Sequence, residues 1–321
     1  MTTVGFHASH EQIPPQVLLR DVQRAEEAGF DAAMCSDHFA PWSVRQGESG
    51  FAWSWLGAAL QATRLPFGVV TAPVQRYHPA VSAQAIATLE SMYPGRFWAA
   101  LGSGEAVNEH ITGDPWPPKE ARDGRLLESV DAMRRLLAGE EVSIRGDIVV
   151  DRARIWSLPA VPPPLIAAAV SAETATSGAA WADGLITVDQ PRATLRAVID
   201  AYRDAGGRGP LAVQVHLSWA ADDDEARAIA LDQWRSGTVP PPLAWDLDSP
   251  ESFDERTADA TADDVARSVQ ISADTGRHLE RLRDLVDLGF DRIFLHHVGR
   301  EQDAFIDAFG EHVLPELRSA A

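Results

Sequence analysis

The sequence has a single cysteine, Cys35, in 321 residues. No disulfide can form within the chain, and a metal site built from several thiolates is excluded. Lysine is just as scarce, because Lys119 is the only one. Schiff-base catalysis therefore has one candidate residue, and a phosphate site has to rely mainly on arginine, backbone N–H groups or hydroxyls.

Positive charge and long apolar runs are also lacking. The chain has 28 lysine and arginine residues against 47 aspartate and glutamate residues, which gives a formal net charge of −19. Nucleic acids and anionic membranes are therefore not expected as partners. No run reaches the roughly 18 apolar residues that a membrane span needs, and residues 1–9 carry neither a basic patch nor a long apolar run. We expect a cytoplasmic protein that acts on a small molecule.

What the sequence does contain is an alternation of short apolar runs with amphipathic stretches. Pro14 and Pro15 can open the first helix, and Gly29 can end it. Eight apolar runs suit strands that are buried on both faces, at residues 4–6, 32–35, 67–71, 97–101, 165–170, 185–188, 211–217 and 293–298. Strands that alternate with helices imply parallel pairing, and no glycine-rich turn of the Rossmann type follows the first strand. The sequence therefore predicts an α/β fold, a (β/α)8 TIM barrel in which residues 1–321 form one domain.

Three longer inserts interrupt the alternation, at residues 38–51, 142–156 and 236–274. The second has the pattern of a β-hairpin. The first and third follow the second and seventh strands, so we expect them in loops over the mouth of the barrel.

Candidate site residues follow the predicted strands. In a parallel barrel all strands end at one rim, so polar residues just after them converge on one pocket. These strand exits carry His7, Glu11, Asp37, His38, Trp42, Gln75, Ser103, Glu105, Asn108, Ser171 and Asp189, with His296 and His297 on the last strand.

The densest cluster is Ser-Asp-His-Phe-Ala-Pro-Trp at residues 36–42. Asp37 can accept a hydrogen bond from a cofactor ring, His38 can transfer a proton near neutral pH, and Trp42 can form an apolar wall. In the alternative interpretation Asp37 caps a turn and His38 is exposed to solvent.

Two further clusters follow the fourth and fifth strands. In the first, Gly102 and Gly104 let a flat ring lie against the backbone, while Glu105 and Asn108 point in similar directions from a helical turn. An ordinary glycine turn is the alternative, and the third glycine of a dinucleotide motif is absent. In the second, Ser171 begins a helix whose free N–H groups could bind a phosphate, although capping alone also explains it.

The histidines do not predict a metal site. His296 and His297 are adjacent in a strand and therefore face opposite sides. His7 and His10 lack a supporting carboxylate at metal-ligand spacing.

Together, several motifs resemble one family. They are residues 36–42, Phe-Ala-Trp-Ser-Trp at 51–55, Arg-Tyr-His-Pro-Ala at 76–80, Tyr-Pro-Gly-Arg at 93–96 and Gly-Ser-Gly-Glu-Ala-Val-Asn-Glu at 102–109. As a set they are similar to the deazaflavin-dependent glucose-6-phosphate dehydrogenase group of the luciferase-like superfamily. The resemblance is dense over residues 8–137 and continues more thinly to the C-terminus.

The resemblance implies a luciferase-like barrel with FMN or coenzyme F-420, a deazaflavin, in its mouth, and a homodimer. The residues that it implies as cofactor contacts are Asp37, Ser103, Gly104 and Asn108 at the ring, with Ala169, Val170 and Ser171 near the phosphate tail. His38 and Glu105 would be the acid/base pair, and Glu11 and Trp42 would line the substrate side. The peptide joining Val69 and Val70 matches the place where the family carries a cis bond against the ring, which costs about 3 kcal/mol for a non-proline residue.

The sequence also departs from this family. Ala72 stands in place of a cofactor-contacting threonine, and Ala169 and Val170 replace a pair of glycines beside the phosphate tail. The family's phosphate-binding lysine has no counterpart at residues 188–192, and Lys119 lies elsewhere in the sequence. FMN and coenzyme F-420 therefore both remain open, and glucose 6-phosphate is not the expected substrate.

The predicted function is hydride transfer between a small organic substrate and a flavin or deazaflavin. An FMN-dependent monooxygenase is the alternative within the superfamily. Outside it, Asp37 and Glu105 could be the paired carboxylates of a barrel glycoside hydrolase, or the protein could bind a flavin without catalysis.

Overall fold

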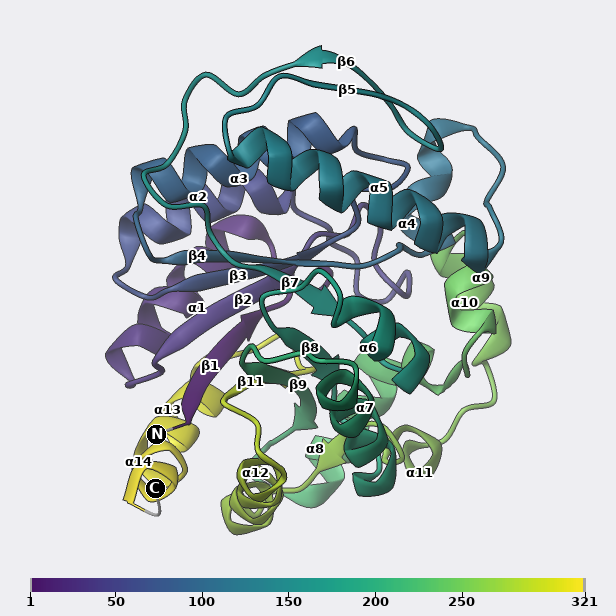
Figure 1. The fold of residues 1–321 in the computed structure, drawn as a ribbon. Coiled ribbons are helices and arrows are strands. Elements are labelled where there is room, and N and C mark those ends of the chain that lie inside the picture. Colours follow the sequence, from purple (N-terminus) through teal and green to yellow (C-terminus); the bar gives the residue numbers. More distant parts are fainter. Residues whose placement is uncertain (1, 320–321) are drawn as a thin grey trace.

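Eight parallel strands form the centre of the computed structural model, and the helices between them surround it (Figure 1). The structure describes residues 2–319. The barrel strands are β1 (Thr3–Ala8), β2 (Ala32–Ser36), β3 (Phe67–Thr71), β4 (Phe97–Leu101), β7 (Leu165–Ala168), β8 (Leu185–Val188), β9 (Leu211–Ser218) and β11 (Arg292–His297). Each of the eight predicted runs is a strand, with boundaries that differ by at most two residues.

The sheet closes on itself. Its strand order is β9-β11-β1-β2-β3-β4-β7-β8, and β8 pairs with β9 to complete the ring. Gly5 of β1 aligns with Phe294 of β11 on one side and with Ala32 of β2 on the other. The predicted (β/α)8 barrel is therefore confirmed.

Helices cover the outside of the barrel. They are α1 (Pro15–Glu27), α2 (Ala52–Ala62), α3 (Pro79–Met92), α4 (Ala106–Glu109), α5 (Lys119–Leu137), α6 (Ala172–Gly178), α7 (Arg192–Asp204), α8 (Asp223–Trp234), α12 (Thr275–Leu288), α13 (Asp303–His312) and α14 (Leu314–Ser319). The first begins as predicted, with Pro15 at its first turn, and Gly29 follows its end with a φ of 98°. None of the helices among residues 2–319 is long and apolar enough to cross a membrane.

Large side chains fill the barrel near the amino ends of its strands. Trp98 of β4 and Phe294 of β11 pack there at a ring distance of 5.6 Å. A Cβ atom at Gly68 of β3 would lie 1.9 Å from the Trp98 ring, so only glycine fits beside it. This apolar plug leaves space for a ligand only towards the carboxyl ends of the strands.

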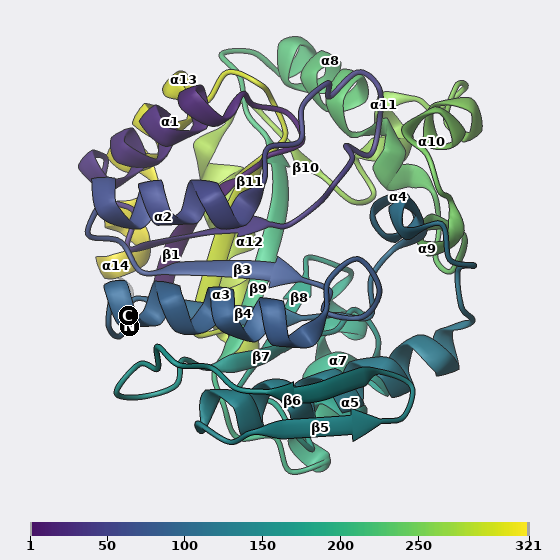
Figure 2. The ribbon, with the colours of Figure 1, turned by 90° about the horizontal axis from the view of Figure 1, so that it is seen from above.

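Two of the three inserts lie at that end. The third forms α9 (Leu243–Asp246), α10 (Pro250–Arg256), α11 (Ala262–Val265) and the short strand β10 (Gln270–Ile271). Figure 2 shows these helices with α4 beyond the arrowhead of β3. The second insert is the predicted hairpin, with β5 (Val142–Arg145) antiparallel to β6 (Val149–Ala153), and it lies outside the barrel against α5.

Candidate active site

A cavity of about 770 Å³ opens at the carboxyl ends of the strands. Its volume lies in the range that ligand sites usually have. The predicted site residues that line it are Glu11, Asp37, His38, Trp42, Val70, Ser103, Gly104, Glu105, Asn108, Ala169, Val170 and Ser171. Residues far apart in the sequence are thus brought to one pocket by the common direction of the strands.

Four of the candidate residues do not line the cavity, namely Val69, Gln75, Asp189 and His297. The side chain of Val69 is fully buried in the core between barrel and helices, whereas that of Val70 lines the cavity. Successive side chains of a strand point to opposite faces, so only one of the two can face the cavity. The peptide between them is trans, because the one cis bond within residues 2–319 joins Pro241 and Pro242. The cis bond implied by the resemblance is therefore wrong for this structure, while a contact of the Val69–Val70 peptide with the cofactor stays a prediction.

Glu11 and His38 form a buried ion pair. Oε1 of Glu11 lies 2.5 Å from Nδ1 of His38, and the side chains are 3% and 14% exposed. Burial alone would lower the pKa of His38, but the charge of Glu11 and its hydrogen bond outweigh burial and raise it. The pKa of Glu11 is lowered, because the charge and hydrogen bond of His38 outweigh the effect of burial. Nε2 of His38 has no protein partner among the described residues, and the ring borders the cavity.

The carboxylate of Asp37 is held by three donors. Trp53 Nε1 lies 3.0 Å from it, Thr71 Oγ1 2.9 Å and Tyr77 OH 3.2 Å. Its side chain is fully buried. These contacts give Asp37 a role in fixing the cavity wall, and they leave it poorly suited as one of the two open carboxylates of a glycoside hydrolase.

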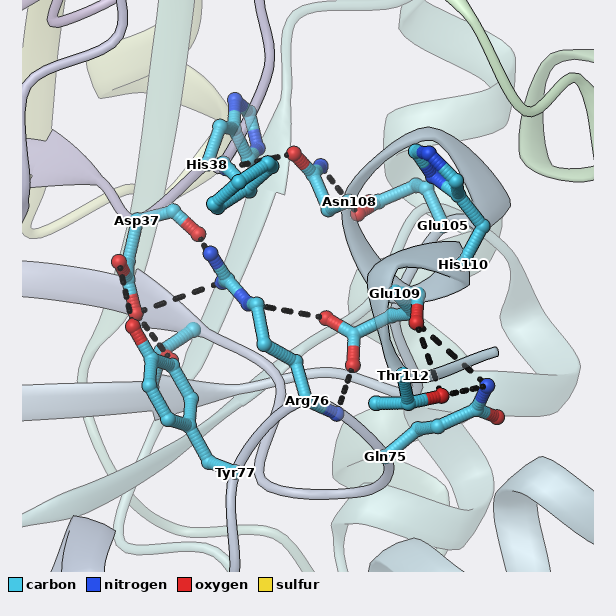
Figure 3. Close-up of polar contacts among 12 residues, drawn as sticks. Asp37, His38, Gln75, Arg76, Tyr77, Glu105, Asn108, Glu109, His110 and Thr112 are labelled. Atoms are coloured by element: carbon cyan, nitrogen blue, oxygen red, sulfur yellow. Dashed lines mark hydrogen bonds and ion pairs between the residues drawn. The ribbon is translucent and has the colours of Figure 1, made fainter. Parts of the chain in front are cut away.

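Arg76 joins Asp37 to Glu109 (Figure 3). Its Nη2 donates to the backbone oxygen of Asp37 at 2.7 Å, and its Nε lies 3.5 Å from Oε1 of Glu109. The backbone N–H of Arg76 donates to the other oxygen of Glu109 at 2.6 Å. Burial raises the pKa of Glu109 to about 7, although Arg76 opposes the shift. Both residues stand in motifs of the sequence, but their contact spans 33 residues, so the sequence alone assigns neither of them a role.

Asn108 connects the loops after β2 and β4. Its Oδ1 accepts from the backbone N–H of Phe39 at 2.8 Å and of Ala40 at 3.3 Å, and its Nδ2 lies 3.5 Å from Glu105 (Figure 3). Glu105 and Asn108 thus point in similar directions, as predicted. Asn108 thereby holds the loop of His38 beside Glu105.

Trp42 links this loop to the third insert. Its ring meets His38 edge to face at 5.1 Å and Phe253 of α10 at 5.4 Å. The predicted apolar wall is therefore supported from behind by a helix that lies more than 200 residues away in the sequence.

Cations border the cavity where α5 begins. Lys119 and Arg122 both line it, so the one lysine reaches the site although it lies far from residues 188–192 in the sequence. Arg122 is 5% exposed, packs on the ring of Trp116 at 4.4 Å and donates to Pro117 O at 3.0 Å. Its Nε has no partner among the described residues. Because α5 connects β4 to the hairpin before β7, these cations lie near the exits of β4 and β7.

Ser171 caps the short helix α6. Its hydroxyl accepts from the N–H of Thr174 at 3.2 Å, and both residues border the cavity. The capping interpretation of the sequence is thus observed, and the hydroxyls remain at the cavity surface.

The two adjacent histidines of β11 face opposite sides, as predicted. His297 stacks on Phe305 of α13 at 5.0 Å, whereas His296 borders the cavity. No group of three or more His, Cys, Asp or Glu side chains suited to a metal ion occurs within residues 2–319.

A flat ring with an anionic tail fits this cavity. Ala72, Gly102, Ala168 and Ala169 give one wall side chains no larger than a methyl group, and such a surface can contact a planar ring closely. The unpaired Nε of Arg122 offers a buried donor for an anion. Both features suit a flavin or deazaflavin with a phosphate-bearing side chain.

Comparisons with known proteins agree with this geometry. Residues 1–303 match the family model of the luciferase-like monooxygenases. The F420-dependent glucose-6-phosphate dehydrogenase of Intrasporangium calvum is 36% identical over 99% of both chains. The F420-dependent hydroxymycolic acid dehydrogenase of Mycobacterium tuberculosis is 35% identical over 98% of this chain and 88% of its own.

A solved structure of an F420-dependent secondary alcohol dehydrogenase in complex with an F420-acetone adduct matches with a TM-score of 0.92. It is 30% identical and covers 99% of each chain. The chain therefore belongs to the luciferase-like monooxygenase family and is an oxidoreductase of its flavin- and deazaflavin-dependent class.

Proposed function

We propose that this protein transfers a hydride between coenzyme F-420 and the carbinol carbon of a small secondary alcohol, or of the corresponding ketone in the reverse direction. The observation that carries the proposal is the Glu11–His38 pair at the edge of the cavity, with Nε2 of His38 free. The relatives named for F420-dependent dehydrogenases support the choice of cofactor.

The cofactor would lie with its ring on the small side chains that include Ala72 and Gly102, near Ser103 and Gly104. Its anionic tail would extend to Lys119, Arg122 and Ser171. When bound, a deazaflavin supplies a two-electron hydride acceptor or donor.

His38 would accept the hydroxyl proton of the alcohol at Nε2 while the hydride leaves the carbinol carbon. Glu11 would hold Nδ1–H of His38 and stabilise the imidazolium that results. Glu105, held beside this loop by Asn108, would stabilise charge at the reacting centre. In ketone reduction the same proton returns from His38 to the substrate oxygen.

The decisive experiment compares cofactors on the purified protein. We expect coenzyme F-420 to bind and to lose its visible absorbance when a secondary alcohol such as 2-propanol is added. Tight binding of FMN without binding of coenzyme F-420 would overturn the proposal in favour of the FMN-dependent monooxygenase. If neither cofactor bound, the assignment of this cavity as the site of a flavin or deazaflavin ring would be wrong.

The proposed site of the anionic cofactor tail, at Lys119, Arg122 and Ser171, can be tested separately. Arg122→Gln should weaken binding of coenzyme F-420 but not of its fragment that lacks the phosphate and the glutamyl tail. Arg125→Gln changes the same helix at a residue that does not line the cavity, and it should bind both compounds as the native protein does. An equal loss of both compounds in Arg122→Gln would contradict a tail site there.

We further propose that the protein is a cytoplasmic homodimer. Trp156 is 85% exposed and Val161 70% exposed in the segment after the hairpin, and apolar side chains of this size are often covered by a second chain. Light scattering on the purified protein should give twice the monomer mass.

A further inference from the structure

One wall of the cavity is built from imidazole and amide side chains. We call His7 of β1, Gln214 and His216 of β9, and His296 of β11 the histidine wall, and all four line the cavity. These three strands are neighbours, and β4 lies opposite β11 in the eight-stranded ring. The histidine wall therefore faces the wall of small side chains across the barrel.

Hydrogen bonds fix the tautomers of two of the rings. Nε2 of Gln214 lies 3.1 Å from Nε2 of His216 and 3.2 Å from Nδ1 of His296. An amide nitrogen only donates, so both ring nitrogens accept. His296 then carries its proton on Nε2 and donates to Gln12 Oε1 at 3.0 Å. His216 carries its proton on Nδ1, which has no partner among the described residues.

His7 has no hydrogen bond at either ring nitrogen, although it is only 3% exposed. Its ring stacks on His296 at 4.3 Å with an angle of 19° between the planes. Stacking occupies a face of the ring and leaves both nitrogens without a partner. A buried polar group without a partner is unfavourable, and because His7 lines the cavity, a ligand there can supply the missing hydrogen bond.

The histidine wall carries no charge at neutral pH. Burial lowers the pKa of His7 to about 3 and that of His216 to about 4, and it lowers the pKa of His296 well below its usual value. The nearest charged groups are Glu11 and His38, which neutralise each other. The wall therefore suits uncharged polar groups and offers no cation to a phosphate.

We propose that the histidine wall, through His7 above all, recognises a second hydroxyl on an uncharged substrate, so that this enzyme prefers diols or polyols to simple alcohols. A hydroxyl both donates and accepts, so it can donate to one nitrogen of His7 and accept from Nδ1–H of His216. The inference rests on the proposed function, because His38 would act on the first hydroxyl.

The wall is not arranged as a metal site. Gln12 and Gln214 already occupy both nitrogens of His296 and one nitrogen of His216. A metal ion would have to displace these bonds to gain three imidazole ligands.

The test compares alcohols that differ by one hydroxyl. Reduction of coenzyme F-420 is measured with 2-butanol against 2,3-butanediol and with 2-pentanol against 2,4-pentanediol. We expect kcat/KM to be at least about tenfold higher for one diol than for its matched alcohol. His7→Leu should abolish the preference, so that kcat/KM of each diol equals that of its matched alcohol, whereas His7→Asn, which keeps a donor and an acceptor, should retain part of it.

His10→Leu is the matched control. His10 is also fully buried and also lacks partners at both ring nitrogens, but it packs against Trp55 at 4.9 Å and does not line the cavity. This variant should keep the preference for the diol. Loss of the preference in both variants would indicate a general loss of structure and contradict a specific role of His7.

A second measurement separates the two proposals. Saturation-transfer NMR reads binding of the same four compounds without turnover. If none reduces coenzyme F-420, the proposed function fails, but preferential binding of a diol to the native protein and not to His7→Leu would still support the histidine wall. Equal handling of diols and simple alcohols in turnover and in binding would overturn the inference.

Discussion

Oε1 of Glu11 lies 2.5 Å from Nδ1 of His38, so the loops after the first two strands of the barrel meet in a buried ion pair. The pair fixes the direction of the imidazole, whose ring borders the cavity. It also sets the protonation of His38, since the charge of Glu11 outweighs burial and raises the pKa of the imidazole.

Glu11→Gln should therefore change the pH dependence of turnover. Alcohol oxidation needs neutral His38, so kcat/KM falls as the pH drops through the pKa of His38. Removal of the Glu11 charge lowers this pKa, and the fall should move to lower pH. The check is a pH profile of coenzyme F-420 reduction. In ketone reduction, which needs protonated His38, the loss of rate at high pH should begin earlier, and unchanged profiles in both directions would contradict the role of the pair.

Tyr77→Phe should weaken cofactor binding. The change removes the hydrogen bond of 3.2 Å to Asp37, and a bond to a charged group contributes about 1.5–3 kcal/mol. Tyr93→Phe is the control, because its hydroxyl donates to Gly57 O at 3.1 Å away from the cavity. Urea unfolding should show a lower free energy of unfolding for both variants, while the dissociation constant of coenzyme F-420 rises only for Tyr77→Phe. A dissociation constant that is unchanged in both variants would contradict a role of Asp37 in shaping the site of the cofactor ring.

Asp21→Asn should stabilise the protein above neutral pH. Burial, with a smaller contribution from the charge of Asp303, raises the pKa of Asp21 to about 7 from an ordinary value of 3.8. The folded protein thus binds this proton more tightly than the unfolded chain, and stability is lost as the pH rises from about 4 to 7. The gain on substitution should be at least on the order of 1 kcal/mol at pH 8, since one unit of pKa shift corresponds to about 1.4 kcal/mol, and it should vanish near pH 4. Urea unfolding at both pH values measures it, and the exposed Asp200→Asn should show no such dependence on pH.

Gly68→Ala and Gly57→Ala should have opposite effects on stability. A Cβ atom at Gly68 would lie 1.9 Å from the Trp98 ring. This overpacking should lower the free energy of unfolding by about 1–3 kcal/mol or more. A Cβ atom at Gly57 of α2 would meet nothing within 4 Å, and alanine favours a helix by about 0.5–1 kcal/mol. Thermal unfolding should give a lower melting temperature for the first variant and a higher one for the second. A Gly68→Ala variant as stable as the native protein would contradict the packing of the plug.

The sequence alone was enough to predict the strands and most of the residues at the cavity. Apolar runs of strand length indicate buried parallel strands, and a polar residue just after such a run must lie at the rim of the barrel. This reasoning placed Asp37, His38 and Glu105 correctly, because it needs only the local pattern and the direction of each strand.

Contacts between distant elements could not be predicted in this way. Arg76 and Glu109 form an ion pair across the exits of β3 and β4, and nothing in either segment indicates the other. The sequence does not place Lys119 at the cavity for the same reason, since only the path of α5 over the rim brings it there.

The sequence by itself determined that this protein is a (β/α)8 barrel with a cluster of polar and ionisable residues at its mouth, because the apolar period and the succession of strands and helices are read along the chain. Only the tertiary structure decided which side chains share the cavity. It placed Val70 inside and Val69 outside, it chose His296 rather than His297 for the cavity, and it set the uncharged histidine wall opposite the wall of small side chains. The physical reason is that the closed ring of strands fixes the rotation of each strand about its own axis, which no single strand specifies.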